Sequence, residues 1–520
     1  MGARSVGAVG EMGRVDHVIV VVLDSLNRHL LGAYGSTEFD TPRLDAFAAT
    51  SVVFDRHHSG SLPCMPARHD LLVGALDFPW RPWGSIEIWE DAVTVELRRR
   101  GVTSMLISDH PHLFEVGGEN YHTDFTSWEY LRGHENDPWR TVADPTWTGS
   151  PALPVERHKK AHFHYDTSRT WFRREEDFPG PATMQAAIDW VGRNGGRHER
   201  SFLLVDEFDP HEPFDTPEPW ASRYRSRVDD PWLIWPPYVT NGLRDGHLTE
   251  SEARSLRAAY GAKLSMIDHW FGRLIDAVDA SPDAGSTAVI VCTDHGHYLG
   301  ERDVWGKPGF PIHDELGHIP LMIRWPGVSP RRTRRLSTTV DVHATICEVF
   351  GVSPTHRVHG RSLVPVIRDD QAVRSEVLSG YWGREVLLIA DEYTYTRGSV
   401  GDGFPLSMWS NRWSTMPIHA RPDVRLPRPD SRAWLDRMPG SDVPVIRQPF
   451  VAGDMLPFWA FGGLVDQHIL YDRRDDPGQL NNLAGRSEYQ ELERDAIEQL
   501  RTELLAIEAP DDLLERIGLA

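Results

Sequence analysis

Hydrophobic residues occur through most of the chain as short continuous runs, separated by longer stretches with helical periodicity. The continuous runs are predicted strands: His17–Leu23, Thr103–Ser108, Phe202–Val205, Ala288–Cys292 and Leu321–Arg324. The periodic stretches are predicted helices: Pro42–Thr50, Ala67–Val73, Ala92–Arg100, Thr183–Arg193, Glu250–Val278 and Val342–Phe350. Apolar strands that alternate with helices are typical of a parallel sheet covered on both faces. We therefore predict an α/β fold with a large, mostly parallel central sheet between helices.

The last part of the chain has a different pattern. Val386–Tyr395 and Val465–Tyr471 resemble strands of a smaller sheet, and Glu488–Ile507 has the apolar stripe and charged face of a terminal helix. We predict a break between residues 14–372, a large α/β domain, and residues 373–520, a smaller α+β domain with an antiparallel sheet and a terminal helix.

The charge balance is acidic. The 520 residues include 55 Lys and Arg against 76 Asp and Glu, which gives a formal net charge of −21. This excess argues against a surface that binds nucleic acid and against a basic patch for membranes. An anionic substrate would need a local positive pocket, built from basic side chains and a metal ion.

Cysteine content and the amino-terminal pattern bear on the compartment. Cys64, Cys292 and Cys347 are too few for a disulfide framework. Met1–Val15 lacks a basic start followed by an apolar core, and the run Val18–Leu23 is too short for a signal core or a membrane span. We expect a cytoplasmic protein without a membrane segment. The oligomeric state stays open, and a homo-oligomer is compatible with the sequence.

Acidic residues directly follow two of the predicted strands. Asp24 comes after His17–Leu23, and the pair Asp294 and His295 comes shortly after Ala288–Cys292. In parallel sheets the carboxyl ends of the strands meet at one edge, where ligands bind. A carboxylate at a strand end can also cap a helix or form a turn. Two such strands, one with an Asp-His pair, favour a divalent metal site.

A cysteine stands at the start of a predicted helix. Cys64 precedes Pro66, a residue suited to a first helical turn, and Arg68 lies one turn further on. A nucleophile there would face the positive end of the helix dipole. An isolated cysteine in this position is more often inert packing, but the Cys-x-Pro-x-Arg spacing favours chemistry.

This motif resembles the signature of the type I sulfatases of the alkaline phosphatase superfamily, in which the cysteine is oxidised to formylglycine. Similar motifs of that family occur in order along the chain: Asp24-Ser25-Leu26, Asp209-Pro210-His211-Glu212-Pro213, Thr293-Asp294-His295-Gly296, Trp305-Gly306-Lys307 and Leu470-Tyr471-Asp472. The resemblance covers nearly the whole chain, and it includes the phosphonate monoester hydrolases.

The resemblance implies roles for individual residues. It implies four metal ligands: Asp24, Asp294, His295 and the modified Cys64. Arg68 would orient the formylglycine hydrate, Lys307 would contact the anionic oxygens, and His211 would protonate the leaving group. A formylglycine-generating enzyme would be required as a maturation partner. These roles supply charge neutralisation and a proton, which sulfuryl and phosphoryl transfer both need.

Several positions depart from the family pattern. Ser25 replaces a second metal-binding Asp, and His295 replaces the Asn of many calcium sulfatases. Imidazole suits manganese or zinc better than calcium, so the metal stays open among calcium, manganese and zinc. A Gly-Lys-Trp-His-like motif is missing. In its place, His110 and His112 are candidate substrate ligands, and His313 is a third.

We therefore expect a sulfuric ester hydrolase that cleaves a small-molecule sulfate monoester. A phosphonate monoester or phosphodiester hydrolase with the same nucleophile is the alternative within hydrolases. A non-catalytic binding protein that kept the fold is the alternative from another class. The alcohol of the ester stays undefined. We expect its recognition in Gly133–Gly180, which resembles a long loop insertion, and in Gly398–Gly453, an irregular stretch rich in Pro, Trp and Arg.

Overall fold

The computed structural model describes residues 12–148, 163–227, 230–309, 311–414, 428–457 and 467–520. In these ranges the largest sheet has nine strands, in the order β11-β2-β10-β7-β1-β5-β3-β4, with β12 beside β2. Its strands are β1 (His17–Leu23), β2 (Val52–His58), β3 (Thr103–Ser108), β4 (Ser127–Tyr130), β5 (Ser201–Glu207), β7 (Thr287–Cys292), β10 (His318–Arg324), β11 (Arg331–Thr333) and β12 (Ser337–Thr338). Only β10 runs antiparallel to its neighbours. The predicted α/β class with a mostly parallel sheet is confirmed.

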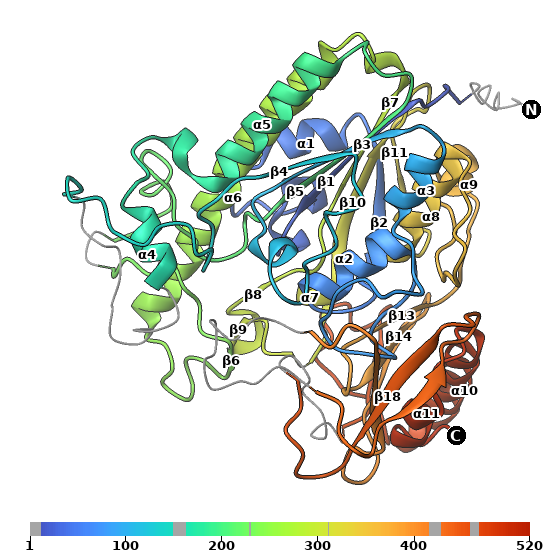
Figure 1. Cartoon of the computed structure of the whole chain (residues 1–520). Helices are drawn as coiled ribbons and strands as arrows, with labels where there is room; N and C mark the ends of the chain where they lie inside the picture. The colour runs from blue at the N-terminus through green and yellow to red at the C-terminus, as the bar shows by residue number, and fades with distance from the viewer. Residues whose placement is uncertain (1–11, 149–162, 228–229, 310, 415–427, 458–466) are drawn as a thin grey trace, which may run out of the picture.

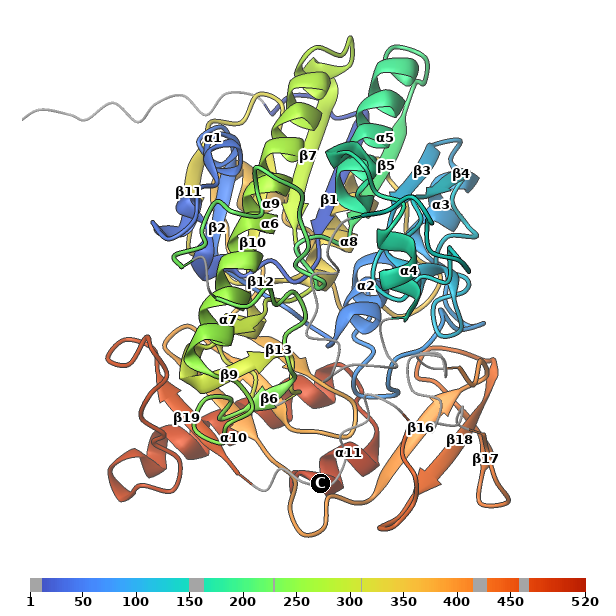
Figure 2. The same cartoon turned by 90° about the vertical axis from the view of Figure 1, so that its left-hand side faces the viewer.

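Helices cover both faces of this sheet (Figures 1 and 2). One face carries α1 (Pro42–Ala48), α5 (Pro179–Asn194) and α6 (Glu250–Asp279). The other carries α2 (Cys64–Val73), α3 (Val93–Arg99), α8 (Thr339–Phe350) and α9 (Val364–Asp369). The shorter α4 (Phe163–Arg169) and α7 (Asp314–Gly317) lie in connecting segments.

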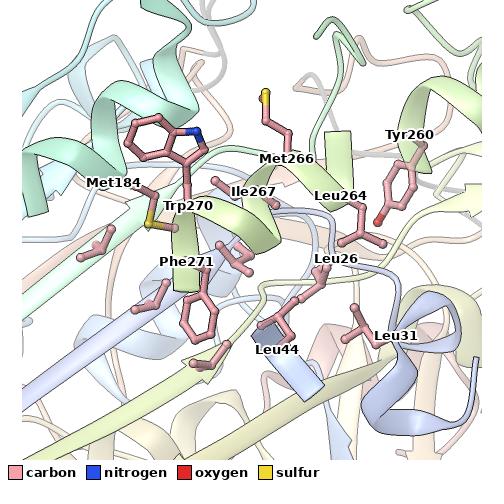
Figure 3. Packing of buried hydrophobic residues seen from close by; sticks show 14 of the residues in the cluster. Leu26, Leu31, Leu44, Met184, Tyr260, Leu264, Met266, Ile267, Trp270 and Phe271 are labelled. Atoms are coloured by element: carbon pink, nitrogen blue, oxygen red, sulfur yellow. The ribbon is translucent and has the colours of Figure 1, made fainter. Parts of the chain in front are cut away.

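The alternation of side chains along β1 explains why it is entirely apolar. Ile19 and Val21 point into the core under α6, whereas Val18 and Val20 pack on the opposite face with α2 and α8. Figure 3 shows the first of these cores, in which Trp270 of α6 meets Met184 of α5. A central parallel strand is buried on both faces, so it has no polar side.

The carboxyl-terminal part, orange and red in Figure 1, forms smaller sheets. A four-stranded antiparallel sheet contains β13 (Val377–Gly380), β14 (Val386–Ile389), β15 (Tyr393–Arg397) and β19 (Ile469–Asp472). The terminal helices are α10 (Gln490–Ala506) and α11 (Asp511–Arg516). The prediction of a single strand over Val386–Tyr395 is therefore wrong, since this segment forms a hairpin of β14 and β15. The boundary between the two predicted domains stays a prediction.

The expected loop insertion Gly133–Gly180 needs correction, and the irregular stretch Gly398–Gly453 contains a sheet. Within 398–453 the described residues form a third sheet, with β16 (Leu406–Ser410), β17 (Trp434–Arg437) and β18 (Pro444–Phe450). Within 133–180 the chain forms α4 and the start of α5, while residues 149–162 lie outside the described ranges. A last small sheet joins β6 (Val239–Thr240), β8 (Tyr298–Leu299) and β9 (Val304–Gly306). Among the described residues, no helix has the length and apolar character to cross a bilayer.

Candidate active site

Two neighbouring parallel strands and one helix bring four potential ligands together. Asp24 follows β1, and Asp294 and His295 follow β7, which pairs directly with β1. Helix α2 brings Cys64 to the same edge of the sheet. One ligand atom from each of these four residues lies within 4.8 Å of the others, and all four residues are buried. The structure thus brings the three residues that follow these strands, Asp24, Asp294 and His295, close to Cys64.

Helix α2 is held firmly enough to fix its first residue. Every residue from Cys64 to Val73 is buried, so the helix lies inside the protein. Within the helix, the Asp70 carboxylate accepts hydrogen bonds from the amide of Ser61, in the preceding loop, at 2.6 Å and from the Ser61 hydroxyl at 2.8 Å. Strand β13 adds main-chain support, because the Leu62 amide donates to the Gly380 carbonyl oxygen at 3.0 Å. The smaller sheet thus supports the loop that positions Cys64.

The donor atoms of this group fit a divalent metal ion. The Nδ1 atom of His295 lies 2.9 Å from the Gly296 carbonyl oxygen and must donate to it, so Nε2 keeps its lone pair. That Nε2 atom is 3.2 Å from the Cys64 sulfur. Asp24 Oδ2 is buried and makes no well-aligned hydrogen bond, although the Arg68 guanidinium lies 2.9 Å away. A set of two carboxylates, one imidazole and the group at position 64 could hold such an ion.

Arg68 joins three carboxylates beneath this group. Its guanidinium lies 2.9 Å from Asp24 Oδ2 and 2.8 Å from Asp294 Oδ2. It also donates two hydrogen bonds to Asp206, at 2.8 and 2.7 Å. Asp206 was not among the predicted site residues, although it directly follows the predicted strand Phe202–Val205 as Asp24 follows its own strand. The same strand-end rule would have found it.

Lys307 approaches from the opposite side. Its Nζ atom lies 3.9 Å from the Cys64 sulfur and 3.3 Å from the Ser25 hydroxyl oxygen. Ser25 in turn donates to Asp24 Oδ1 at 2.7 Å and adopts a left-handed φ of 61°. Gly306 allows this approach, because its φ is 72° and a side chain there would come within 2.4 Å of the Tyr238 ring. Ser25 therefore sits beside the ligand group, where a second Asp was missing from the sequence.

Opposite charges in this cluster stabilise one another despite complete burial. Burial alone would raise the pKa of Asp24, but Arg68 and the neighbouring basic groups lower it well below its ordinary value. Burial would likewise lower the pKa of Arg68, but Asp206 and the other two carboxylates raise it. Both groups therefore stay charged at every physiological pH.

His211 follows β5 and lies beside the group. Its Nδ1 atom is 2.8 Å from the Glu212 carbonyl oxygen, and its ring stacks on Phe208 with centroids 4.1 Å apart. Burial lowers the pKa of His211 to about 4, with Lys307 adding to the effect. In the free protein His211 is therefore neutral at pH 7, and its Nε2 atom is unprotonated because Nδ1 must donate to a carbonyl. Its predicted role as an acid requires a bound anion to restore the proton, and stays a prediction.

The two histidines after β3 differ in their surroundings. His110 is fully buried, lies 3.6 Å from Asp24 Oδ2, and has no hydrogen-bond partner on either ring nitrogen. His112 forms ion pairs with Glu115 through Nδ1 and with Glu135 through Nε2, the latter at 3.2 Å. His110 is thus adjacent to the ligand group, whereas the ion pairs of His112 are with Glu115 and Glu135, outside that group.

The ion pairs of His112 should make stability depend on pH. Although burial works against the charge, Glu115 and Glu135 raise its pKa from 6.5 to about 10. Because the pKa of His112 is higher in the folded protein, its ion pairs stabilise the fold fully below the unfolded pKa of 6.5. This stabilisation is lost as the pH rises toward 10. We expect His112→Gln to lower the apparent Tm by several degrees at pH 6, and much less at pH 10. Calorimetric scans across this range measure the difference.

His122 offers a matched control for that experiment. Its Nδ1 atom bonds the Leu113 carbonyl oxygen at 2.9 Å, and partial burial lowers its pKa. The change in Tm caused by His122→Gln should therefore not become smaller between pH 6 and pH 10. An equal Tm change for His112→Gln at both pH values would contradict the assigned ion pairs.

His313 does not join the cluster. Its Nδ1 atom lies 3.1 Å from the Tyr298 hydroxyl and its Nε2 atom 3.5 Å from that of Tyr471. Among the described contacts, none links it to the four potential ligands. The residue therefore connects the loop before α7 with β19, and its predicted role in substrate binding stays a prediction.

Comparison with known proteins agrees with this geometry. The sulfatase family model matches residues 16–352. Choline-sulfatase of Rhizobium meliloti is 24% identical over 384 residues, which cover 68% of this chain and 71% of that protein. Human iduronate 2-sulfatase is 24% identical over 341 residues, which cover 60% of each chain.

The fold comparison extends over almost the whole chain. The crystal structure of the phosphonate monoester hydrolase of Agrobacterium radiobacter superposes with a TM-score of 0.64 and 18% identity, covering 95% of both chains. A 2-O GAG sulfatase gives a TM-score of 0.62 and 16% identity, covering 96% of this chain and 93% of its own. The fold is thus that of the sulfatases and of related phosphonate hydrolases. The chain itself belongs to the sulfatase family, whose members are hydrolases acting on sulfuric ester bonds.

Proposed function

We propose that this protein hydrolyses a small-molecule sulfate monoester, with Cys64 converted to formylglycine as the nucleophile. The observation that supports this most directly is the position of Cys64 at the first turn of α2, inside the group formed with Asp24, Asp294 and His295. Burial raises the pKa of the unmodified Cys64 thiol well above its ordinary value, which leaves it a poor nucleophile. An aldehyde hydrate at this position does not depend on forming a thiolate.

The side chains around Cys64 divide the work of the reaction. Lys307, 3.9 Å from the sulfur at position 64, would bind the sulfate oxygens, and Arg68 holds the carboxylates in place. The hydrate supplies one hydroxyl that attacks sulfur and expels the alcohol, and a second that lets sulfate leave as the aldehyde re-forms. His211, whose Nδ1 atom donates to a carbonyl oxygen, would take up a proton on Nε2 when the anionic ester binds and deliver it to the departing alkoxide.

The same proposal includes a divalent metal held by Asp24, Asp294, His295 and the group at position 64. When bound, the metal would neutralise charge on the ester oxygens. The imidazole of His295 favours manganese or zinc over calcium, because calcium prefers oxygen ligands alone. The preference is testable by measuring which ion restores most activity, and raises the apparent Tm most, after chelation.

Mass spectrometry of the tryptic peptide His57–Arg68 tests the modification. We expect residue 64 to carry an aldehyde in place of the cysteine CH2SH group when the protein is made together with a formylglycine-generating enzyme. Without that enzyme the peptide should keep its thiol, which serves as the internal control. An intact thiol in protein from the competent host would contradict the mechanism.

The rate ratio between an aryl sulfate and the matching aryl phosphonate tests the substrate class. We expect the sulfate to have the higher kcat/KM, since choline-sulfatase and iduronate 2-sulfatase are among the relatives with similar sequences. The phosphonate alternative is supported by the fold comparison, since structures of phosphonate monoester hydrolases match this chain with 95% coverage of both chains. A ratio that favours the phosphonate would establish that alternative.

A further inference from the structure

A surface cleft that the proposed reaction does not use lies at one edge of the nine-stranded sheet. Its volume is about 590 Å³, which is within the range of small-molecule sites. Four ring side chains line it: Phe114, His122, Trp128 and Tyr130. We call it the β4 cleft, because Trp128 and Tyr130 belong to β4, the last strand at that edge (Figure 2).

The rings of the β4 cleft form one continuous aromatic surface. Trp128 and Tyr130 are two residues apart on a strand, so their side chains point to the same face. Phe114 stacks on Tyr130 with centroids 4.1 Å apart and contacts Trp128 at 5.5 Å. His122 meets Phe114 at 4.7 Å and Trp128 at 4.8 Å. Trp128 is nevertheless 48% exposed, so a large flat ring stays open to a ligand.

The charged side chains of the lining are already paired. Asp137 accepts hydrogen bonds from Arg132 Nε at 2.8 Å and from Nη2 at 2.7 Å. Gly133, whose φ is 111°, lets the chain turn back so that its amide also donates to Asp137, at 2.7 Å. Glu115, the remaining charged residue of the lining, pairs with His112. A charged ligand would therefore find no unpaired counter-charge in the β4 cleft.

Donors and acceptors nevertheless stand beside the rings. The bonds to Asp137 engage Nε and Nη2 of Arg132, whereas Nη1 makes none of them, and this side chain is 39% exposed. His122 Nδ1 lies 2.9 Å from the Leu113 carbonyl oxygen and must donate to it, so its Nε2 atom is an acceptor. The β4 cleft thus combines an aromatic surface with hydrogen-bonding groups of both kinds.

Two buried histidines separate the β4 cleft from the candidate active site. Glu115 of the lining pairs with His112, whose ring lies 5.2 Å from that of His110. His110 in turn lies 3.6 Å from Asp24 Oδ2. Among the described residues of the lining, none is a potential metal ligand. The β4 cleft is therefore a site of its own.

We propose that the β4 cleft binds an uncharged pyranose sugar. Such a ring has C–H faces that stack on an indole, and hydroxyl groups at its edge that both donate and accept. The exposed ring of Trp128 would carry the sugar, with Arg132 donating to its hydroxyls and His122 accepting. A purely apolar ligand would bury these polar groups without partners. The inference goes beyond the proposed function, because the cleft does not contain Cys64.

Saturation-transfer difference NMR with methyl β-glycosides of glucose, galactose and xylose tests the proposal. We expect at least one of them to bind the wild type with a Kd of about 1–10 mM, as befits a small ligand. Trp128→Ala should weaken this binding about tenfold or more, and Trp128→Phe, which keeps a smaller ring, should weaken it less. Trp434→Ala is the matched control. Trp434 is 43% exposed on β17, and its loss should leave the Kd unchanged.

The same assay separates the alternatives without turnover. Cys64→Ala should bind the glycosides as the wild type does, whether or not the protein hydrolyses sulfate esters. Loss of binding in Cys64→Ala, or unchanged binding in Trp128→Ala, would overturn the assignment to the β4 cleft. Binding of phenol but of no glycoside at concentrations up to about 50 mM would overturn the choice of a sugar. Tighter binding of methyl β-glucuronide than of methyl β-glucoside would overturn the choice of an uncharged one.

Discussion

Cys64→Ala should lower kcat/KM for an aryl sulfate by roughly 10⁴-fold or more, because nothing else in the group can act as the nucleophile. The residue occupies the first position of α2, and its sulfur lies 3.2 Å from His295 Nε2 and 3.9 Å from Lys307 Nζ. The replacement removes only one sulfur atom from a helix whose other residues are all buried. The apparent Tm should therefore fall by no more than a few degrees.

Cys64→Ser separates the aldehyde from a simple hydroxyl nucleophile. A serine could attack the ester once but has no second hydroxyl on the same carbon with which to release sulfate. We therefore expect a single burst of alcohol, at most equal to the enzyme concentration, followed by a stable sulfated protein visible in the intact mass. Steady turnover by Cys64→Ser, at a rate close to that of the wild type, would refute the formylglycine mechanism.

The ligand group was predictable because strand ends in a parallel sheet obey a simple geometric rule. Asp24, Asp294 and His295 follow strands that the apolar runs mark clearly, and β1 and β7 are neighbours. Cys64 and Arg68 were predictable from their spacing at the start of a helix. Asp206 obeys the same strand-end rule, so its position near the ligand group was also predictable from the sequence.

The surroundings of His211 lay beyond what the sequence could reveal. Glu135 and Tyr238 stand in segments without periodicity, and no local signal places either near His211. Tyr238 precedes β6, which reaches the site by pairing with β9, the strand that carries Lys307 at its end. The sheet within 398–453 escaped prediction for a related reason, since short strands rich in Pro, Trp and Arg lack a clear alternation. Both the position of Tyr238 and the sheet within 398–453 depend on pairing between strands that lie far apart in the sequence.

Arg68→Met should lower both stability and activity, because Met fills a similar volume but leaves three carboxylates without their common partner. The Arg68 side chain is 2% exposed, and Asp24, Asp206 and Asp294 all lie within 2.9 Å of its guanidinium. Breaking a buried ion pair from one side typically costs about 3–5 kcal/mol. We expect a comparable loss in the free energy of unfolding, measured in urea, and a fall in kcat/KM of about 10²–10³-fold.

A double-mutant cycle with Asp206→Asn tests whether the loss comes from the unpaired carboxylates. Since Asp206 bonds Arg68 twice, removing its charge together with Arg68 should cost at least about 1 kcal/mol less than the sum of the single changes. Strictly additive losses would contradict the proposed coupling.

Arg81→Met is the matched control for activity. Arg81 is also 2% exposed and pairs with Asp77 at 2.5 Å and Glu87 at 3.1 Å, but it has no contact with the ligand group. It should therefore lose stability to a similar degree and keep kcat/KM per folded molecule within a few-fold of the wild type. If Arg81→Met lost as much activity as Arg68→Met, the effect of Arg68 would be one of folding alone, and its role in holding the catalytic carboxylates would have to be abandoned.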